Sequence, residues 1–436
     1  MPVPSGDRHD PPDQDVLRVA LYSGVVFGHD AVSTSFLHKL RILTELRDSG
    51  LPIEVTGFTH ASDFPDPDIH VVSGLTDLMR TSEFTAADVH VFEYTMWYEL
   101  LNALFLIDRP SLVIDHNTTP VELINDPTVR LACARARHER HNLSRATHVA
   151  AVGEFTRHEL LTMGFAADGV SVLHLPAATA VPVGSSIRRS RRPGDPLKLL
   201  YVGRFVRAKG VLDLLDAVEA LWVDGKTDVT LTMAGSVRFP DTAVLNAVEE
   251  ACAAHRGDGL LTMHVDLPDD EIAELYAASD VFVIPSHHEG FCVPVIEAMT
   301  SGCFVIGSDA GNIPYVMGGL GMLFPSGDSG ALAVAIARYA EEITSAERAD
   351  REPVLATSSG PLGLADWHER VARHLLDYGT DAYEAGFLRL LAAVLEKGPT
   401  PTAPPWLIAA ARSSGTPSHV SDESSPGRTE LSVPMR

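Results

Sequence analysis

Short apolar runs alternate with helical patterns along the first part of the chain. The runs cover residues 17–22, 53–57, 89–92, 112–115 and 148–152. After the first run, Asp30 or Ser33 is placed to cap a helix with an apolar face. That face carries Phe36, Leu37, Leu40 and Leu43. Strands that alternate with amphipathic helices predict a parallel sheet covered by helices on both faces.

The same alternation restarts near residue 197 in a second unit. Its predicted strands cover residues 197–202, 229–234, 261–265, 281–285 and 304–308. Its predicted helices cover residues 211–221, 269–278, 293–301, 331–344, 366–376 and 382–397. We therefore expect an α/β protein with two doubly wound, Rossmann-like domains that face a central cleft. In such sheets, ligands bind beyond the carboxyl ends of the strands, close to helix N-termini.

The alternation stops between Ala177 and Pro196, where Pro, Gly, Ser and the arginine-rich run 188–192 dominate. We interpret this segment as a solvated interdomain linker, and binding of phosphate or lipid headgroups by the arginines is the alternative. The predicted organisation is a disordered N-terminus (1–15), an N-terminal domain (16–180), a linker (181–196), a C-terminal domain (197–376), a C-terminal helix (377–397) and a disordered tail (398–436) with at most a short turn at 406–411.

The chain carries a strong excess of negative charge. Of its 436 residues, 58 are Asp or Glu and 34 are Lys or Arg, so the formal net charge is −24. Nucleic acids and anionic membranes are bound through clustered positive charge, which argues against both as partners. The sequence shows neither a secretory signal pattern nor an apolar stretch of about 18 residues. We expect a soluble, cytoplasmic protein.

The spacing of cysteines and histidines does not predict a metal site. The four cysteines are Cys133, Cys252, Cys292 and Cys303. No two of them form a C-x-x-C pair. The run His287-His288-Glu289 lacks a third ligand at a suitable spacing, and no H-E-x-x-H motif is present. We expect no metal and no cofactor.

The segment 286–299 follows a predicted strand and enters a helix. Pro294 stands close to the first helical position, where proline is favoured. The backbone N–H groups of Phe291, Cys292 and Val293 then lack helical partners. Donors of this kind form an anion site at the end of a helix.

Two glutamates in the same segment are candidates for ligand binding. Glu289 lies before the helix at the edge of the expected cleft. Glu297, one turn into the helix, is placed to accept hydrogen bonds from a ribose diol. Taken singly, each is also explained as a solvated loop or helix residue.

A second polar turn lies at 203–210. A predicted strand ends at Gly203, and Arg204 and Lys209 flank the turn into the next helix. Arginine grips a diphosphate with two parallel hydrogen bonds, and lysine adds a compact charge. Alone, such a turn is more often a solvated loop.

Together these segments resemble the retaining GT-B glycosyltransferases of family 4, also called glycosyl transferases group 1. The resemblance rests on Gly203-Arg204, Lys209-Gly210 and the pair Glu289-x7-Glu297. It extends through residues 231–235, 269–286, 302–306 and 319–324, and covers residues 196–345 in all. In the first half it is weaker, and rests on residues 115–120 and 151–155.

The resemblance implies a role for each matched residue. Arg204 and Lys209 would hold the donor diphosphate and neutralise its charge as it leaves. Glu297 would bind the nucleotide ribose, and Glu289 would hold the donor sugar. His116 would contact the sugar near the reacting centre; read in isolation, it is as well explained as a structural histidine. The other implied donor-binding residues are Gly203, Gly235, Leu267, Gly290, Phe291, Cys292 and Val293. An acceptor or phosphate loop would contain Gly24 and Gly28.

The chain departs from the family pattern at four places. Cys292 replaces a usual glycine, and Tyr315 stands where an acidic residue commonly follows proline. Gly153 replaces a usual serine. The loop from Gly24 to Gly28 is looser than the tight double glycine of the family. These changes leave the implied reaction class intact and bear on the donor sugar and the acceptor.

The resemblance implies a retaining transferase that moves a hexose-type sugar from UDP or GDP to a small natural-product, lipid or glycan acceptor. In the expected same-face displacement, the diphosphate leaves and its oxygen accepts the proton of the acceptor, while cations stabilise the developing charge. A catalytically inactive, GT-B-like binding or regulatory protein is the alternative; the presence of Arg204, Lys209 and Glu289 disfavours it. A dehydrogenase would need G-x-G-x-x-G after a strand, which neither half contains.

Overall fold

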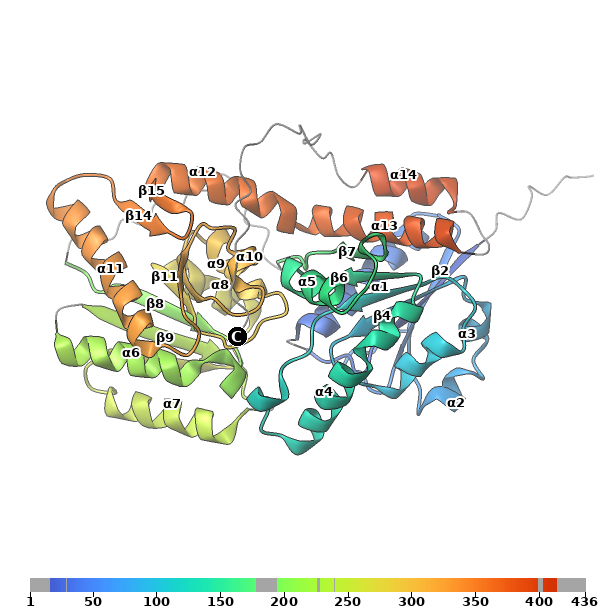
Figure 1. Ribbon diagram of the computed structural model, residues 1–436, viewed down its shortest axis with the longest axis horizontal. Helices are drawn as coiled ribbons and strands as arrows, with labels where there is room; N and C mark the ends of the chain where they lie inside the picture. The colour runs from blue at the N-terminus through green and yellow to red at the C-terminus, as the bar shows by residue number, and fades with distance from the viewer. Residues whose placement is uncertain are drawn as a thin grey trace, which may run out of the picture.

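The computed structural model describes residues 16–28, 30–177, 194–225, 228–238, 240–398 and 403–413. Its helices and strands form two α/β domains that lie side by side (Figure 1). The predictions made for residues 1–15, for the linker at 181–193 and for the end of the tail at 414–436 lie outside the described residues.

The N-terminal domain is built on a seven-stranded parallel sheet. Its strands are β1 (Leu17–Tyr22), β2 (Ile53–Thr59), β3 (Ile69–Val71), β4 (Val89–Tyr94), β5 (Ser111–Asp115), β6 (His148–Ala151) and β7 (Val170–Val172). They lie in the order β3-β2-β1-β4-β5-β6-β7, so the strand order reverses between β1 and β4. Val19 and Leu21 enter one buried cluster while Ala20 and Tyr22 enter another. Both faces of β1 are therefore covered, which explains why the strand is a continuous apolar run.

Helices cover both faces of this sheet. They are α1 (Ala31–Asp48), α2 (Leu75–Leu78), α3 (Ser82–Ala86), α4 (Pro127–Glu139) and α5 (Glu154–Thr162), with 3₁₀ turns at Glu99–Phe105, Val121–Leu123, Arg140–Arg145 and Ala167–Gly169. Asp30 caps α1, because its Oδ1 accepts a hydrogen bond from the N–H of Ser33 at 2.8 Å. Phe36, Leu40 and Leu43 are buried beneath the helix, as the sequence predicts.

The C-terminal domain repeats the same connectivity on a six-stranded parallel sheet. Its strands are β8 (Leu197–Val202), β9 (Val229–Gly235), β10 (Leu261–Val265), β11 (Val281–Ile284), β12 (Phe304–Ser308) and β13 (Met322–Phe324). Their order is β10-β9-β8-β11-β12-β13, which places the switch point between β8 and β11. The helices are α6 (Val211–Asp224), α7 (Thr242–Ala254), α8 (Asp269–Ala278), α9 (Val293–Thr300), α10 (Ile313–Val316) and α11 (Ser329–Arg348), with a 3₁₀ turn η5 (Arg207–Lys209). The predicted pair of doubly wound domains is confirmed.

The last helices run back from the second domain to the first. An antiparallel hairpin of β14 (Val354–Thr357) and β15 (Gly360–Gly363) precedes α12 (Leu364–Leu375), the 3₁₀ turn η6 (Leu376–Tyr378), α13 (Thr380–Lys397) and α14 (Pro405–Ser413). Figure 1 shows α12 over the C-terminal domain and α13 over the N-terminal domain.

The predicted disordered tail is wrong for α14. This helix packs on α13 and buries Leu407 and Ala411. The Pro- and Ser-rich composition of the tail does not predict this helix. Its apolar face is stabilised by packing against α13, and local sequence does not indicate that contact.

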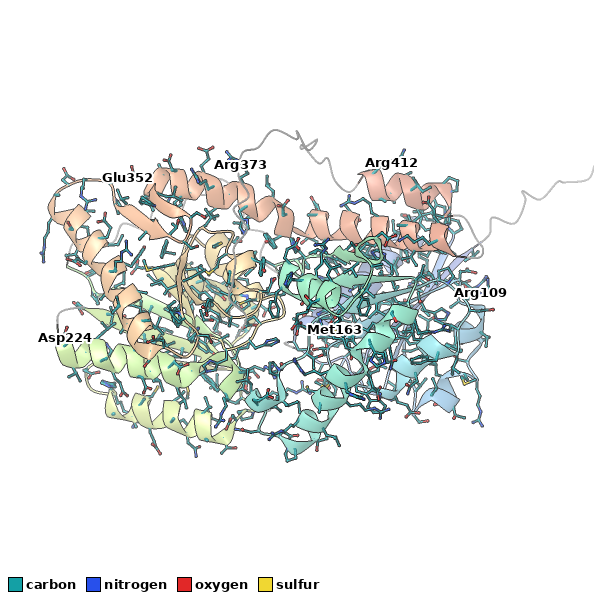
Figure 2. The ribbon with its side chains drawn as sticks, in the orientation of Figure 1. Arg109, Met163, Asp224, Glu352, Arg373 and Arg412 are labelled. Atoms are coloured by element: carbon teal, nitrogen blue, oxygen red, sulfur yellow. The ribbon has the colours of Figure 1, made fainter. Side chains whose placement is uncertain are left out.

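Charged side chains lie on the outside of both domains. Asp224, Glu352 and Arg373 project from the periphery of the C-terminal domain (Figure 2). Within the described residues, every helix is too short or too polar to span a bilayer.

Candidate active site

A charged pair joins the turn after β8 to the loop after β11. Lys209 ends η5, and the N–H of His287 donates to the carbonyl of Ala208 at 2.8 Å, which holds the two segments together. The Nζ of Lys209 lies 2.6 Å from Oε1 of Glu289, and Ser286 Oγ donates to the same oxygen at 2.7 Å. Burial opposes ionisation of Glu289, but Lys209 and Ser286 outweigh it and hold the pKa of the carboxyl below its ordinary value. A buried carboxylate and a cation therefore meet in the predicted donor site.

His116 of the N-terminal domain lies beside the loop that carries Glu289. It follows β5, and its backbone lies against Gly290 in the β11–α9 loop (residues 285–292). A β-carbon at Gly290 would lie 2.1 Å from the carbonyl oxygen of His116 and 3.1 Å from the Cβ of Asn117. Only glycine permits this approach. The structure thus places His116 beside the loop that carries Glu289, as the resemblance implies.

A buried ionic network that the sequence analysis did not predict lies behind His116. The Nε2 of His116 is 2.6 Å from Oε2 of Glu93 at the end of β4, and Oε1 of Glu93 accepts from Nζ of Lys39 on α1 at 2.7 Å. Lys39 also donates to Ser35 Oγ, and the hydroxyl of Tyr383 on α13 lies 3.3 Å from that oxygen. The network links the C-terminal helix to the predicted sugar-binding histidine.

Charge is retained in this network despite complete burial. Desolvation raises the pKa of Glu93, but Lys39 and His116 outweigh it, so the pKa lies below its ordinary value. Desolvation lowers the pKa of Lys39, but Glu93 and Tyr383 outweigh it, so the pKa lies above its ordinary value. An ionised Glu93 requires a proton on Nε2 of His116, and we assign that tautomer to the neutral ring. Nδ1 of that tautomer carries no proton and can accept a hydrogen bond.

The sequence does contain a signal for this network. Lys39 stands among Phe36, Leu40 and Leu43 on the apolar face of the predicted helix. A lysine in such a stripe is buried, and a buried lysine needs an anion. Glu93 directly follows the predicted strand 89–92, at the same sheet edge as His116.

Helix α9 begins as predicted, with Pro294 in its first turn. Cys292 occupies the N-cap with φ at 85°, in the left-handed region that favours glycine, and its side chain makes no capping hydrogen bond. This geometry explains why the resembling family has glycine there. In the described part of the chain, the N–H groups of Phe291, Cys292 and Val293 have no protein acceptor. They are available to an anion.

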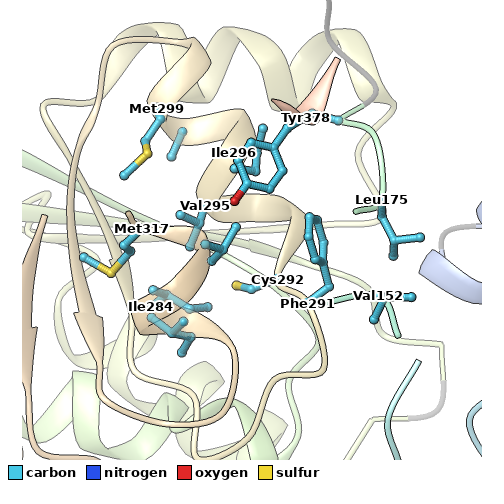
Figure 3. Packing of buried hydrophobic residues seen from close by; sticks show 14 of the residues in the cluster. Val152, Leu175, Ile284, Phe291, Cys292, Val295, Ile296, Met299, Met317 and Tyr378 are labelled. Atoms are coloured by element: carbon cyan, nitrogen blue, oxygen red, sulfur yellow. The ribbon is translucent and has the colours of Figure 1, made fainter. Parts of the chain in front are cut away.

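The side chains of Phe291 and Cys292 are buried. Figure 3 shows both packed in a buried cluster with Val152, Leu175 and Tyr378. The rings of Phe291 and Tyr378 lie 5.9 Å apart. These two residues can therefore contribute backbone atoms to a ligand site, while the ring of Phe291 packs against His174 of the N-terminal domain.

Glu297 lies one turn into α9 and is half-buried. Its Oε2 accepts a hydrogen bond from the hydroxyl of Tyr276 at 3.1 Å. Burial raises the pKa of Glu297; the Tyr276 bond opposes this shift, and Asp269 adds to it. A half-buried carboxylate held in place by a tyrosine is suited to accept hydrogen bonds from a diol.

The remaining predicted donor residues surround the same sheet edge. Gly203 follows β8 and donates from its N–H to the carbonyl of Ala234 at 3.0 Å. The side chain of Arg204 is exposed in the same connection that carries Lys209. Gly235 ends β9, and Leu267 is half-buried in the turn after β10. None of these residues lies away from the carboxyl ends of the strands.

The loop with Gly24 and Gly28 faces the other domain. The guanidinium of Arg238 lies 4.6 Å from the ring centroid of Phe27 in this loop and pairs with Asp63 at 2.9 Å. Open space surrounds the position of a β-carbon at Gly28. The structure places this loop at the domain boundary, where an acceptor-binding or phosphate-binding role stays a prediction.

No group of three or more His, Cys, Asp or Glu side chains with the geometry of a metal site occurs among the described residues.

The chain has the GT-B class of fold. It contains two doubly wound domains, and polar residues lie at the carboxyl ends of the strands beside both switch points. Solved structures share this fold. Sucrose-phosphate synthase from Thermosynechococcus elongatus superposes with a TM-score of 0.63 at 19% identity, over 87% of this chain and 99% of that one. Anabaena Alr3699/HepE in complex with UDP-glucose gives a TM-score of 0.60 at 16% identity, over 86% and 100% of the two chains.

Sequence comparisons match the C-terminal domain in particular. Residues 185–352 match the family model of glycosyl transferases group 1. O-antigen chain mannosyltransferase B from Escherichia coli is 26% identical over 208 residues, which are 45% of this chain and 52% of that protein. MMP alpha-(1->4)-mannosyltransferase from Mycolicibacterium hassiacum is 34% identical over 113 residues, 26% of each chain. The chain thus spans about half, or less, of the length of these curated relatives.

Proposed function

We propose that this protein is a retaining glycosyltransferase of family 4 that uses a nucleoside-diphosphate sugar, UDP- or GDP-linked, without a metal ion. The observation that carries the proposal is the meeting of Lys209, Glu289 and His116 at the domain boundary, beside the free amides of α9. The match of residues 185–352 to glycosyl transferases group 1 supports it, as do the two relatives named as mannosyltransferases.

The cationic side of the site suits a diphosphate. Lys209 and Arg204, in the connection after β8, and the first-turn amides of α9 offer positive charge and hydrogen-bond donors. Negative charge grows on the diphosphate as the sugar leaves, and preorganised donors stabilise that charge at no cost of reorganisation. These groups take the place of a divalent cation in the proposal.

The opposite side of the site suits the sugar. Glu289 is ionised and lies where positive charge develops on the ring as the diphosphate departs. The Nδ1 of His116 accepts a hydrogen bond from a sugar hydroxyl because Glu93 holds the proton on Nε2. One oxygen of the leaving diphosphate then accepts the proton of the acceptor hydroxyl. The bond from the acceptor oxygen to the anomeric carbon forms on the same face of the sugar ring from which the diphosphate departs.

A screen of nucleotide sugars tests this proposal. Thermal shift and donor hydrolysis are measured for UDP- and GDP-linked sugars in the presence of EDTA, and the anomer of the product is determined by NMR. We expect binding that survives the chelator and retention at the anomeric carbon. Loss of binding in EDTA contradicts the metal-free site, an inverted product contradicts the retaining mechanism, and no response to any donor contradicts the transferase itself. A cytoplasmic location is part of the proposal, and the acceptor is a small natural product, a lipid or a glycan.

Glu297→Ala should mainly raise the KM for the donor. The ribose contact is made equally in the ground state and the transition state, so its loss changes binding more than kcat. Because burial raises the pKa of Glu297, donor KM should also fall as the pH rises through that pKa and the carboxylate ionises. Glu297→Gln, which cannot ionise, should abolish this part of the pH profile. A KM that stays at the wild-type value in Glu297→Ala contradicts the ribose role.

Glu289→Ala should instead depress kcat, by roughly a hundredfold, with a smaller effect on KM. The carboxylate faces charge that exists only in the transition state. Steady-state kinetics with the donor found in the screen separate the two glutamates. Equal losses in both parameters for both variants would show that the ribose and sugar roles are assigned wrongly.

A further inference from the structure

The N-terminus of α5 is capped from the other domain. Gly153 occupies the N-cap and has no side chain to accept from the first-turn N–H groups, which a helix leaves unpaired. The N–H of Phe155 donates instead to Oδ1 of Asn312, at 3.2 Å, from the turn before α10 in the C-terminal domain. The helix of one domain is thus capped by a side chain of the other.

Asn312 also holds the β11–α9 loop. Its backbone N–H donates to the carbonyl of Glu289 at 3.0 Å, and its Nδ2 donates to the carbonyl of Phe291 at 3.1 Å. Asn312 is only 2% exposed, so each of these groups would be costly to leave unpaired. The ring of Phe155 adds an edge contact to His288 in the same loop, at 6.1 Å between centroids.

Gly153 and Asn312 fit only as a pair. A β-carbon at Gly153 would lie 2.4 Å from Oδ1 and 2.6 Å from Nδ2 of Asn312. The serine that the resemblance leads us to expect at position 153 would cap α5 within its own domain and would expel the amide. The absence of a side chain at 153 is therefore what admits Asn312.

We propose that Asn312 is a positioning residue that joins domain closure to the shape of the β11–α9 loop. When the domains are together, Asn312 caps α5 and fixes the carbonyls of Glu289 and Phe291, so that Glu289 and the amides of α9 stand ready for the donor. When they separate, α5 loses its cap. The part of this inference that concerns the donor rests on the proposed function. Exposed contacts at the domain rim, such as Arg238 with Asp63, are of the kind that contributes little.

The test compares Asn312→Ala, Gly153→Ser and the double variant Gly153→Ser/Asn312→Gly, with Asn125→Ala as the control. Asn125 is exposed and forms a hydrogen bond with Asp241 across the domain boundary. Asn125→Ala therefore removes an interdomain contact that does not involve the β11–α9 loop. The measurements are steady-state kinetics, calorimetric titration with UDP and with GDP, and small-angle X-ray scattering with and without each nucleotide.

We expect Asn312→Ala to lower kcat by roughly ten- to hundredfold and to enlarge the radius of gyration. Nucleotide affinity should fall less than kcat, because Lys209 and Arg204 still hold the diphosphate. Gly153→Ser should also lower kcat and enlarge the radius of gyration, because the serine expels the side-chain amide of Asn312. The control should match the wild type. The double variant caps α5 with its own serine, so it should regain part of the thermal stability that Asn312→Ala loses, while kcat and scattering stay those of Asn312→Ala.

Two results overturn the proposal. One is wild-type kcat and scattering in Asn312→Ala. The other is recovery of kcat and compactness in the double variant, since the cap alone would then be sufficient. If wild-type protein binds neither nucleotide and turns over no donor, the proposed function fails separately. The scattering of the unliganded proteins still decides the role of Asn312: more extended variants uphold the interdomain link, and unchanged ones overturn it.

Discussion

Lys209→Ala and Arg204→Ala should each lower kcat by roughly two to three orders of magnitude, the scale for removing one preorganised group that stabilises charge in the transition state. Lys209 is the better defined of the two, because its Nζ is fixed 2.6 Å from Glu289 and its loop is tied to His287. Arg204 is exposed in this structure and would turn onto the diphosphate when the donor binds.

Two neighbouring residues supply matched controls for these substitutions. Arg207→Ala removes an exposed arginine from the same connection, and Lys198→Ala removes an exposed lysine from β8. Both should retain wild-type kcat, whereas a general loss of positive charge would affect all four variants alike. Circular dichroism and thermal unfolding show whether each variant is folded. Near-normal turnover in both Lys209→Ala and Arg204→Ala would contradict the proposed role of these residues in binding the diphosphate.

The strands of this fold could be predicted closely from the sequence. The runs at 17–22, 261–265 and 304–308 coincide with β1, β10 and β12. β1 and β12 are apolar runs because both of their faces are buried, whereas β10 is a partly exposed strand at the edge of its sheet. The sequence does not predict the β14–β15 hairpin, the three-residue strands β3, β7 and β13, or the helices α7 and α14. β15 contains Gly and Pro, and α14 depends on burial against α13.

Some residues of the site can likewise be predicted from the sequence, and others cannot. Lys209, Glu289, Gly290 and His116 come together as the resemblance implies, since each stands at the end of a strand. Asn312 could not be found from local pattern, because the N–H that it caps lies 157 residues away in the other domain. Contacts of that separation depend on how the two domains meet. No periodicity or turn signal records that arrangement.

Lys39→Met should destabilise the protein by about 3–5 kcal/mol, the usual cost of removing one partner from a buried ion pair. The side chain of Lys39 is fully buried and that of Glu93 is 2% exposed, so the remaining carboxylate could not be hydrated. Because the pKa of Glu93 is lowered in the fold, its contribution is complete above the ordinary carboxyl pKa and is lost as the pH falls through the folded value. The pKa of Lys39 is raised, so its contribution is lost as the pH rises through the folded value.

The double variant Lys39→Met/Glu93→Gln separates stability from function. It contains no unpaired buried charge, so denaturant unfolding should show most of the lost stability recovered and a flatter dependence on pH. Its kcat should nevertheless stay roughly ten- to hundredfold below wild type, the range for groups that orient a functional residue, because Glu93 no longer fixes the proton on Nε2 of His116. Tyr383→Phe retains the ring and removes only the hydroxyl near Ser35, and it should change kcat little. If the double variant recovers kcat together with stability, the network serves the fold alone and His116 needs no charged partner.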